Sequence, residues 1–192
     1  MLAPDYQRQI TRFAHSKGLA THLDGARIFN AAVKLKVSVQ EAASRFDSVS
    51  VCLSKGLGAP AGSILVGSKP LIDDARRWRK VLGGGMRQAG VLAAAGLYAL
   101  QHHVARLAED HENAEYLAQG LRAAGYLVAA PQTNMVYVEI AAEEVGALSQ
   151  HLDQRGILAT VAPRTRLVTH LDLSRAKIDA VIAAFRELPR RS

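Results

Sequence analysis

Two residues of this sequence have the chemistry and the placement of a catalytic pair. Lys55 follows an apolar, β-branched run and is followed by a glycine. Asp24 ends another short strand-like segment earlier in the chain. A lysine amine can form a Schiff base with an aldehyde, and a carboxylate can keep a ring nitrogen protonated. A strand-end aspartate followed by a strand-end lysine is therefore what pyridoxal phosphate (PLP) chemistry requires.

Each of the two residues alone also has an ordinary structural explanation. Asp24 before Gly25 is typical of a residue that caps a turn or a helix, and lysines commonly end strands at a surface. Both residues, however, follow apolar strand segments, so they are predicted to emerge at the same carboxyl edge of a parallel sheet. Open α/β sheets bind ligands at that edge. Gly56, Gly58 and Gly62 leave space there for a planar cofactor.

Hydrophobic periodicity predicts the elements that position this pair. Ser38 is expected to cap a helix, with Glu41 at the capping-box position. The first part of the chain is predicted to be helical over residues 5–17, 27–36, 39–46, 70–80 and 88–103. Strands are predicted over residues 19–23, 48–53 and 62–67. Residues 83–88 are expected to be the most flexible stretch.

The pattern changes in the second part of the chain, which is predicted to form a small α+β unit. A long amphipathic helix over residues 104–124 leads into it. Strands are predicted over residues 126–129, 135–140, 157–161 and 167–170, and helices over 143–155 and 174–188. The domains are therefore expected to be residues 1–103 and 104–192. Four histidines, His102, His103, His111 and His151, are assigned to solvated helix faces.

Composition and charge argue against a nucleic-acid-binding, a secreted or a membrane-spanning protein. The net charge is +7, the basic residues are scattered, and their one cluster, over residues 76–80, has no aromatic residue besides Trp78. An anionic small ligand explains that cluster as well as nucleic acid does, and no nucleic-acid partner is expected. The single Cys52 excludes an internal disulfide and suits the cytoplasm. No apolar run is long enough to span a membrane, and no signal peptide is expected.

Four motifs taken together resemble the low-specificity L-threonine aldolases, which are PLP enzymes of the aspartate-aminotransferase (type I) fold. The motifs are His-Leu-Asp-Gly-Ala-Arg over 22–27, Cys-Leu-Ser-Lys-Gly-Leu-Gly over 52–58, Gly-Gly-Gly-Met-Arg-Gln over 83–88 and Arg-Leu-Val-Thr-His over 166–170. The resemblance covers essentially the whole chain. It implies an α/β fold, with a partial large domain that has a mainly parallel sheet and a small C-terminal α+β domain.

The resemblance also implies roles for individual residues. Lys55 would bind PLP covalently, Asp24 would pair with the pyridine nitrogen, and Ser54 and Arg27 would contact the cofactor. The carboxylate of the substrate would be held by Arg27 and by a further group of basic residues, namely Arg166, Arg87 and Lys80. No metal ligand is implied.

The implied reaction is retro-aldol cleavage of a small β-hydroxy-α-amino acid, L-threonine or L-allo-threonine, to glycine and acetaldehyde. The implied assembly is a homo-oligomer, either a dimer or a tetramer. Two alternatives stay open. The chain could be another type I enzyme, a β-eliminating lyase or an aminotransferase. It could also be an inactive fragment or an interaction module of such an enzyme.

Members of this family continue before the segment that matches here, with a glycine-containing loop that holds the cofactor phosphate. No glycine-rich loop opens a helix upstream of Asp24. The chain is therefore expected to be the C-terminal portion of such an enzyme. Its strands are expected to present an unpaired edge and an uncovered apolar face, which favour association.

Overall fold

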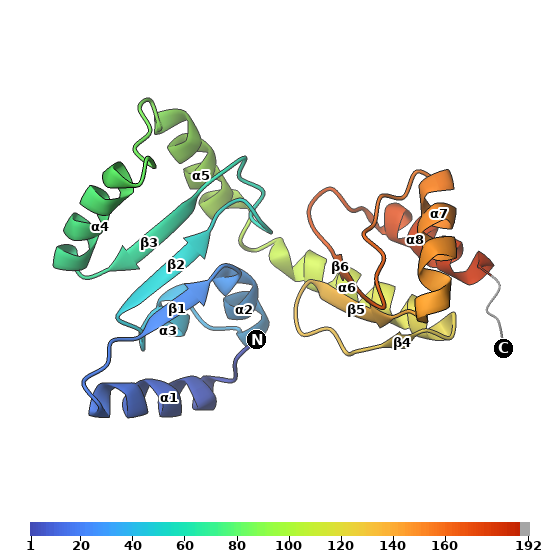
Figure 1. Ribbon diagram of the computed structural model, residues 1–192, viewed down its shortest axis with the longest axis horizontal. Coiled ribbons are helices and arrows are strands. Elements are labelled where there is room, and N and C mark those ends of the chain that lie inside the picture. The colour runs from blue at the N-terminus through green and yellow to red at the C-terminus, as the bar shows by residue number, and fades with distance from the viewer. Residues whose placement is uncertain (189–192) are drawn as a thin grey trace. The chain divides into compact units, whose positions relative to one another are not determined.

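The computed structural model of the chain, shown in Figure 1, describes residues 1–188. The chain divides into two compact units, Met1–Leu107 and Ala108–Ser192. The division falls a few residues after the domain boundary that the sequence predicts. Among residues 1–188, no helix combines the length and the apolar composition that crossing a membrane requires.

The first unit alternates helices and strands. Its helices are α1 (Pro4–Ser16), α2 (Ile28–Leu35), α3 (Val39–Ala43), α4 (Lys69–Val81) and α5 (Gly90–His102). Its strands are β1 (His22–Gly25), β2 (Ser48–Cys52) and β3 (Ser63–Gly67). The predicted cap of α3 is confirmed, because the hydroxyl oxygen of Ser38 accepts a hydrogen bond from the amide of Glu41 at 3.0 Å.

The strands of the first unit form a sheet in the order β1-β2-β3, with β1 parallel and β3 antiparallel to β2 (Figure 1). The register pairs Leu23 with Val49 and Asp24 with Ser50. Because successive side chains alternate between the faces of a strand, Leu23, Val49 and Val51 share one face and Asp24 and Ser50 share the other. The apolar face packs against α2 and α3, and Asp24 therefore lies on the opposite, more polar face.

Gly25 allows β1 and β2 to approach closely. A Cβ atom on this residue would lie 2.7 Å from the carbonyl oxygen of Ser50 and 2.9 Å from Cγ1 of Val49. Both atoms belong to β2, and one of them is backbone, so a side chain could be accommodated only by moving the strand. Glycine at this position is therefore required by packing.

Asp47 closes the amino edge of the same sheet. One oxygen of its carboxylate accepts hydrogen bonds from Nε2 of His15 at 2.9 Å, from the amide of Thr21 at 2.7 Å and from the hydroxyl of Thr21 at 2.8 Å. These bonds, that from His15 foremost, hold the pKa of Asp47 well below its ordinary value. The carboxylate thus ties α1 to the points where β1 and β2 begin.

β3 is exposed along its whole length, although its sequence is apolar. The exposed fractions of Ile64, Leu65 and Val66 are 40%, 40% and 51%. Strands with a continuous apolar run are normally covered on both faces. The expected uncovered apolar surface is therefore present at this edge of the sheet.

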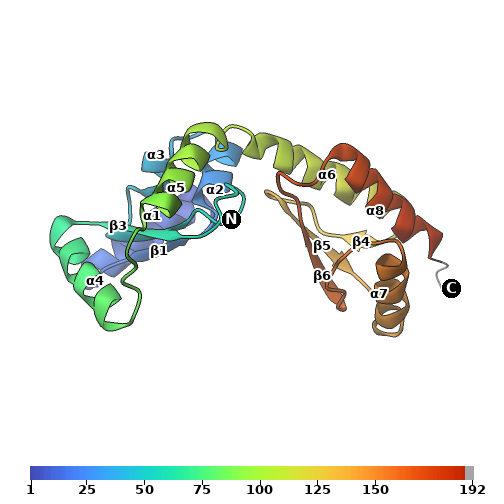
Figure 2. The same ribbon diagram turned by 90° about the horizontal axis from the view of Figure 1, so that it is seen from above.

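The second unit is a three-stranded antiparallel sheet with helices packed on it. Its helices are α6 (Leu107–Ala123), α7 (Val145–Gln154) and α8 (Arg175–Glu187), with a short 3-10 turn η1 (Ala142–Glu144). Its strands are β4 (Leu127–Val128), β5 (Met135–Glu139) and β6 (Arg164–Val168), in that order across the sheet. Figure 2 shows the helices gathered on one side of these strands. Val136 and Val138 of β5 are fully buried against Leu121, Leu148 and Phe185 of the helices.

In the second unit, one predicted strand is wrong and another is displaced. The side chains of residues 157–161 alternate between core and solvent, as in a strand. Ile157, Ala159 and Val161 pack against the core, while Leu158 is 91% exposed. Their backbone, however, is not paired in the sheet of the described residues, so they form an extended connection. The last strand begins at Arg164 rather than at residue 167, since pairing with β5 and not apolar content sets its start.

Replacing Gly25 by alanine is expected to destabilise the first unit by about 1–3 kcal/mol, because the new methyl group overpacks the contact between β1 and β2. Denaturant unfolding measures the effect. The matched control is Gly90→Ala at the start of α5, where an added Cβ meets no atom within 4 Å. That change should alter the free energy of unfolding by no more than about 0.5 kcal/mol. Equal effects of the two substitutions would contradict the packing argument.

The lowered pKa of Asp47 predicts an acid-sensitive contribution to stability. Because the folded state holds this pKa below its unfolded value of 3.8, the contribution is complete above that value and is lost as the pH falls toward the folded pKa. Asp47→Asn should therefore cost most near neutral pH, and the deficit in stability should begin to shrink only as the pH falls below about 4.

Urea unfolding at several pH values tests this dependence. Asp74→Asn removes the same charge from an exposed residue of α4 that makes no hydrogen bond or ion pair within the described chain. If the deficit caused by Asp47→Asn stays constant from pH 7 to pH 3, the proposed role of this carboxylate is wrong.

Candidate active site

The sheet of the first unit brings several of the predicted site residues to one edge. β1 and β2 are parallel and end on the same side. Asp24 lies near the end of strand β1, and Arg27 follows it just before α2. Ser54 and Lys55 follow the end of β2. The carboxyl edge therefore combines an amine, a carboxylate, a hydroxyl group and a guanidinium group.

Asp24 uses only part of its hydrogen-bonding capacity. Its Oδ1 accepts a hydrogen bond from the amide of Ala26 at 3.0 Å, which caps the turn between β1 and α2. Its Oδ2 has no hydrogen-bond partner among residues 1–188. The turn-capping role and the ring-nitrogen role are thus compatible, because one oxygen is left to accept a proton donor.

Arg27, three residues after Asp24, has one polar atom that lacks a partner among residues 1–188. Its Nε is buried and has no hydrogen-bond partner in the described part of the chain. A buried N–H of a charged group is costly when no acceptor is present. An anionic ligand at this edge would supply one, so the donor set fits a negatively charged molecule.

Lys55 is exposed at the tip of the loop between β2 and β3, and its amine makes no hydrogen bond or ion pair within the described residues. The next residue, Gly56, is buried. A Cβ there would lie 3.0 Å from Cδ2 of Leu107 and 3.2 Å from Oδ1 of Asn30. The loop therefore packs closely against α2 at Gly56, while the side chain of Lys55 remains exposed.

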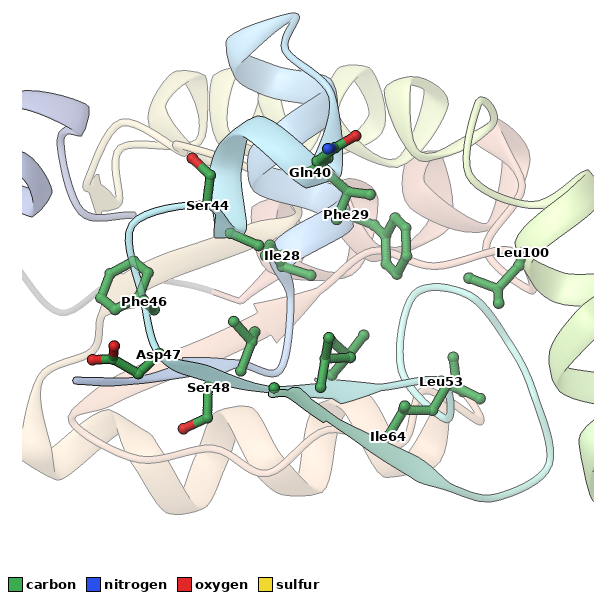
Figure 3. A pocket seen from close by; sticks show the side chains of 16 residues that line it. Ile28, Phe29, Gln40, Ser44, Phe46, Asp47, Ser48, Leu53, Ile64 and Leu100 are labelled. Carbon is green, nitrogen blue, oxygen red and sulfur yellow. The ribbon is translucent and has the colours of Figure 1, made fainter. Parts of the chain in front are cut away.

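A separate cavity of about 510 Å³ opens under α2 and α3 on the apolar face of the sheet. Figure 3 shows Ile28, Phe29 and Leu53 among the side chains that line it. None of the predicted site residues belongs to this lining. Because Asp24 lies on the other face, we interpret the cavity as a gap in packing rather than as part of the candidate site.

Lys80 and Arg87 are placed away from direct contact with the other candidates. Lys80 lies in the last turn of α4, and Arg87 lies in the connection to α5. Both side chains are exposed. Within the described chain, neither one forms a hydrogen bond or an ion pair with Asp24, Arg27 or Lys55, so a role for either requires a ligand between them.

Arg166 belongs to the second unit. It lies on β6 opposite Tyr137, and its side chain is exposed. Its neighbour on the same face, Arg164, forms an ion pair with Glu139 at 3.7 Å and stacks on the ring of Tyr137 at 5.1 Å. Arg166 has no ion pair among residues 1–188. Of the two arginines, it is therefore the one available for a ligand.

Two residues to which the sequence analysis gives no role in the site support the loop that carries Lys55. Asn30 is 3% exposed and lies against Gly56. His103 donates a hydrogen bond from Nδ1 to the carbonyl oxygen of Leu57 at 2.6 Å. The assignment of His103 to a solvated helix face is therefore wrong. Helical periodicity marks which face a residue occupies, but it does not show which distant carbonyl that face meets.

Comparison with known proteins gives one family match and several similar chains. A family model described as β-eliminating lyase matches residues 1–143. The low-specificity L-threonine aldolase of Escherichia coli K12 is 48% identical over 186 residues, which are 97% of this chain and 56% of that protein. A crystal structure from Exiguobacterium sp., provisionally named an aromatic amino acid β-eliminating lyase/threonine aldolase, has a TM-score of 0.82 and 25% identity. The match covers 97% of this chain and 57% of that one.

A more distant structure shares the same fold. A serine palmitoyltransferase from S. paucimobilis, solved with a bound PLP–myriocin adduct, has a TM-score of 0.69 and 20% identity over 97% of this chain and 50% of that one. These likenesses confirm the predicted fold class, an α/β chain with part of the type I fold of PLP-dependent enzymes. The chain spans only about half the length of the proteins that it matches.

Proposed function

The chain belongs to the β-eliminating lyase family, and on this premise we propose that it forms part of a PLP-dependent lyase that cleaves L-threonine and L-allo-threonine to glycine and acetaldehyde. The observation that carries the proposal is the placement of Asp24 and Lys55 at the carboxyl ends of adjacent parallel strands. The 48% identity to the E. coli aldolase, which extends over nearly the whole chain, supports the choice of substrate.

The residues of the carboxyl edge fit PLP as a cofactor. Lys55 offers an amine that is unpaired within residues 1–188 for covalent attachment, and Oδ2 of Asp24, which likewise has no partner there, would accept a hydrogen bond from the protonated ring nitrogen. Ser54 would donate a hydrogen bond from its hydroxyl group to the cofactor. The unsatisfied Nε of Arg27 would bind an anionic group of the cofactor or of the substrate.

The bound cofactor would supply an electron-accepting ring, conjugated to the substrate nitrogen, that takes up the electron pair of the breaking Cα–Cβ bond. Asp24 would keep the proton on the ring nitrogen, because an adjacent carboxylate favours the charged form of a base. The amine of Lys55 would hold a proton that can be delivered to Cα. A base would take the proton of the β-hydroxyl group as its carbon becomes the aldehyde carbon.

The substrate carboxylate would be bound by guanidinium groups, which match its two oxygens with two parallel N–H donors. Arg27 and Arg166 are proposed for this role, since neither forms an ion pair within residues 1–188. Arg87 and Lys80 are proposed as further contacts for the anion. Their exposure at and after the end of α4 leaves them accessible to a ligand.

A second candidate reaction is favoured by the family description itself. In β-elimination, Asp24 and Lys55 would keep their roles, but the bond broken would be that from Cβ to its leaving group. The products, a 2-oxo acid and ammonia, distinguish this reaction from aldol cleavage.

We also propose that residues 1–103 form the C-terminal part of the cofactor domain and residues 104–192 the small domain, in a homo-oligomeric, cytoplasmic enzyme. The exposed apolar residues of β3 support association, because an apolar strand with an open edge is a template for pairing. The single Cys52 supports a reducing compartment.

Lys55→Ala is expected to abolish covalent uptake of PLP. Borohydride reduction followed by peptide mass spectrometry locates the modified residue. In the intact protein, threonine cleavage should fall by at least about 10²- to 10⁴-fold, since the group that holds the proton is removed. Lys34→Ala, on the exposed surface of α2, is the matched control and should keep both signals. Cleavage of threonine at the parent rate by Lys55→Ala would make the assignment wrong.

Arg166→Lys is expected to raise the KM for threonine by roughly tenfold or more, because lysine cannot replace a bidentate guanidinium group. Steady-state kinetics measure the change. Arg164→Lys, on the same strand and face but already paired with Glu139, should leave KM nearly unchanged. An equal rise of KM in both variants would argue against a specific role of Arg166.

A further inference from the structure

The loop that carries Lys55 makes few hydrogen bonds of its own. The amide of Gly58 donates to the carbonyl of Lys55 at 2.9 Å, and the amide of Ala59 donates to the carbonyl of Leu53 at 3.1 Å. These two bonds close a tight turn around the lysine. They leave the carbonyl of Leu57 pointing outside the turn, where a group from elsewhere in the fold must satisfy it.

His103 supplies that group. Its Nδ1 lies 2.6 Å from the carbonyl oxygen of Leu57. A carbonyl oxygen can only accept, so Nδ1 carries the proton in either charge state of the ring. Leu57 is 3% exposed, and water cannot easily replace a hydrogen bond at a position so deeply buried. The contact therefore joins the loop to a residue far away in sequence.

The histidine is itself held in place by α5. It is the C-terminal cap of that helix, and its amide donates to the carbonyl of Ala99 at 2.9 Å. Its ring meets the ring of Tyr98 edge-on, with centroids 5.5 Å apart. The backbone hydrogen bond and the ring contact thus both fix the position of Nδ1. A residue that positions the Lys55 loop needs to be held in this way.

The other end of the loop rests on the same helix. A Cβ on Gly96 of α5 would lie 2.9 Å from Cδ1 of Leu53, so the first residue of the loop sits directly on the helix backbone. Leu53, Leu57 and Ala99 belong to one buried cluster. Lys55 therefore lies at the exposed tip between two anchors, an apolar one at Leu53 and a polar one at Leu57.

We propose that His103 is a positioning residue for Lys55, acting through its hydrogen bond to the carbonyl of Leu57. This inference rests on the proposed role of Lys55 in binding PLP. Covalent attachment and proton delivery both need the amine at a defined point. A misplacement of about 1 Å is enough to cost roughly 10²-fold in rate. His103 touches neither cofactor nor substrate in this scheme and works only through the loop.

The test compares three single variants in the full chain. His103→Phe keeps a ring against Tyr98 and removes the donor. His103→Asn places an amide nitrogen near the former Nδ1 and restores a donor. His102→Phe is the matched control, since the ring of His102 packs against that of Tyr98, with centroids 4.3 Å apart, and His102 makes no hydrogen bond to the loop within the described residues. If His103→Phe does not fold, His103→Ala replaces it.

Two readouts are needed. Hydrogen exchange of the amides of Gly58 and Ala59, measured without cofactor, reports the loop directly. It should accelerate roughly two- to tenfold in His103→Phe, as loss of one hydrogen bond implies, and return toward the parent rate in His103→Asn. The Kd for PLP, from the absorbance of the lysine-bound cofactor, should rise by a similar factor in His103→Phe alone. His102→Phe should change neither quantity.

The outcomes separate the inference from the proposed function. Unchanged amide exchange in His103→Phe overturns the inference, whatever the cofactor does. Faster exchange with an unchanged Kd for PLP also overturns it, because the loop would then not control the lysine. If the parent chain takes up no PLP at Lys55, the proposed function fails, and the exchange rates alone still decide whether His103 holds the loop.

Discussion

The close parallel pairing of β1 with β2 is the constraint on which the candidate site depends. It is possible because Gly25 has no side chain to meet the carbonyl of Ser50 and the side chain of Val49. This pairing sets the register, and the register places Asp24 opposite Ser50 on the polar face. The carboxylate and the loop that begins just beyond β2 therefore share one edge of the sheet. The parallel pairing of the two strands is by itself sufficient to bring the segments of Asp24 and Lys55 to this edge.

The two edges of this sheet differ in how their polar groups are satisfied. At the amino edge, Asp47 receives three hydrogen bonds and serves the fold. At the carboxyl edge, within residues 1–188, Asp24 accepts one hydrogen bond, the amine of Lys55 donates none, and the Nε of Arg27 is buried without a partner. Hydrogen-bonding capacity that the fold leaves unused is costly unless a ligand completes it. This difference in hydrogen bonding supports the choice of the carboxyl edge, rather than the amino edge, as the candidate binding site.

Much of the fold follows from local patterns in the sequence. Period-2 and period-3.6 spacing locate the helices and most of the strands, and the cap at Ser38 is readable from its own segment. The failure at residues 157–161 has a clear cause: alternation reports where side chains go, whereas a strand also needs a neighbour for its backbone. The candidate residues at the carboxyl edge could be named from sequence because each follows directly after the apolar segment that forms its strand. His103 and Asn30 could not, because each acts on a segment that is remote in the chain.

The connection between β2 and β3 has a consequence for the order in which the site is assembled. β2 and β3 pair antiparallel across the Lys55 loop, with Cys52 opposite Ser63, whereas β1 reaches β2 only after α2 and α3. Closing the shorter loop costs less chain entropy, by an amount on the order of 1 kcal/mol. Loss of the β1 pairing would separate the carboxylate from the amine while leaving the lysine turn intact. A partly opened molecule would then keep the turn that carries Lys55, but the carboxylate of Asp24 would no longer be held beside it.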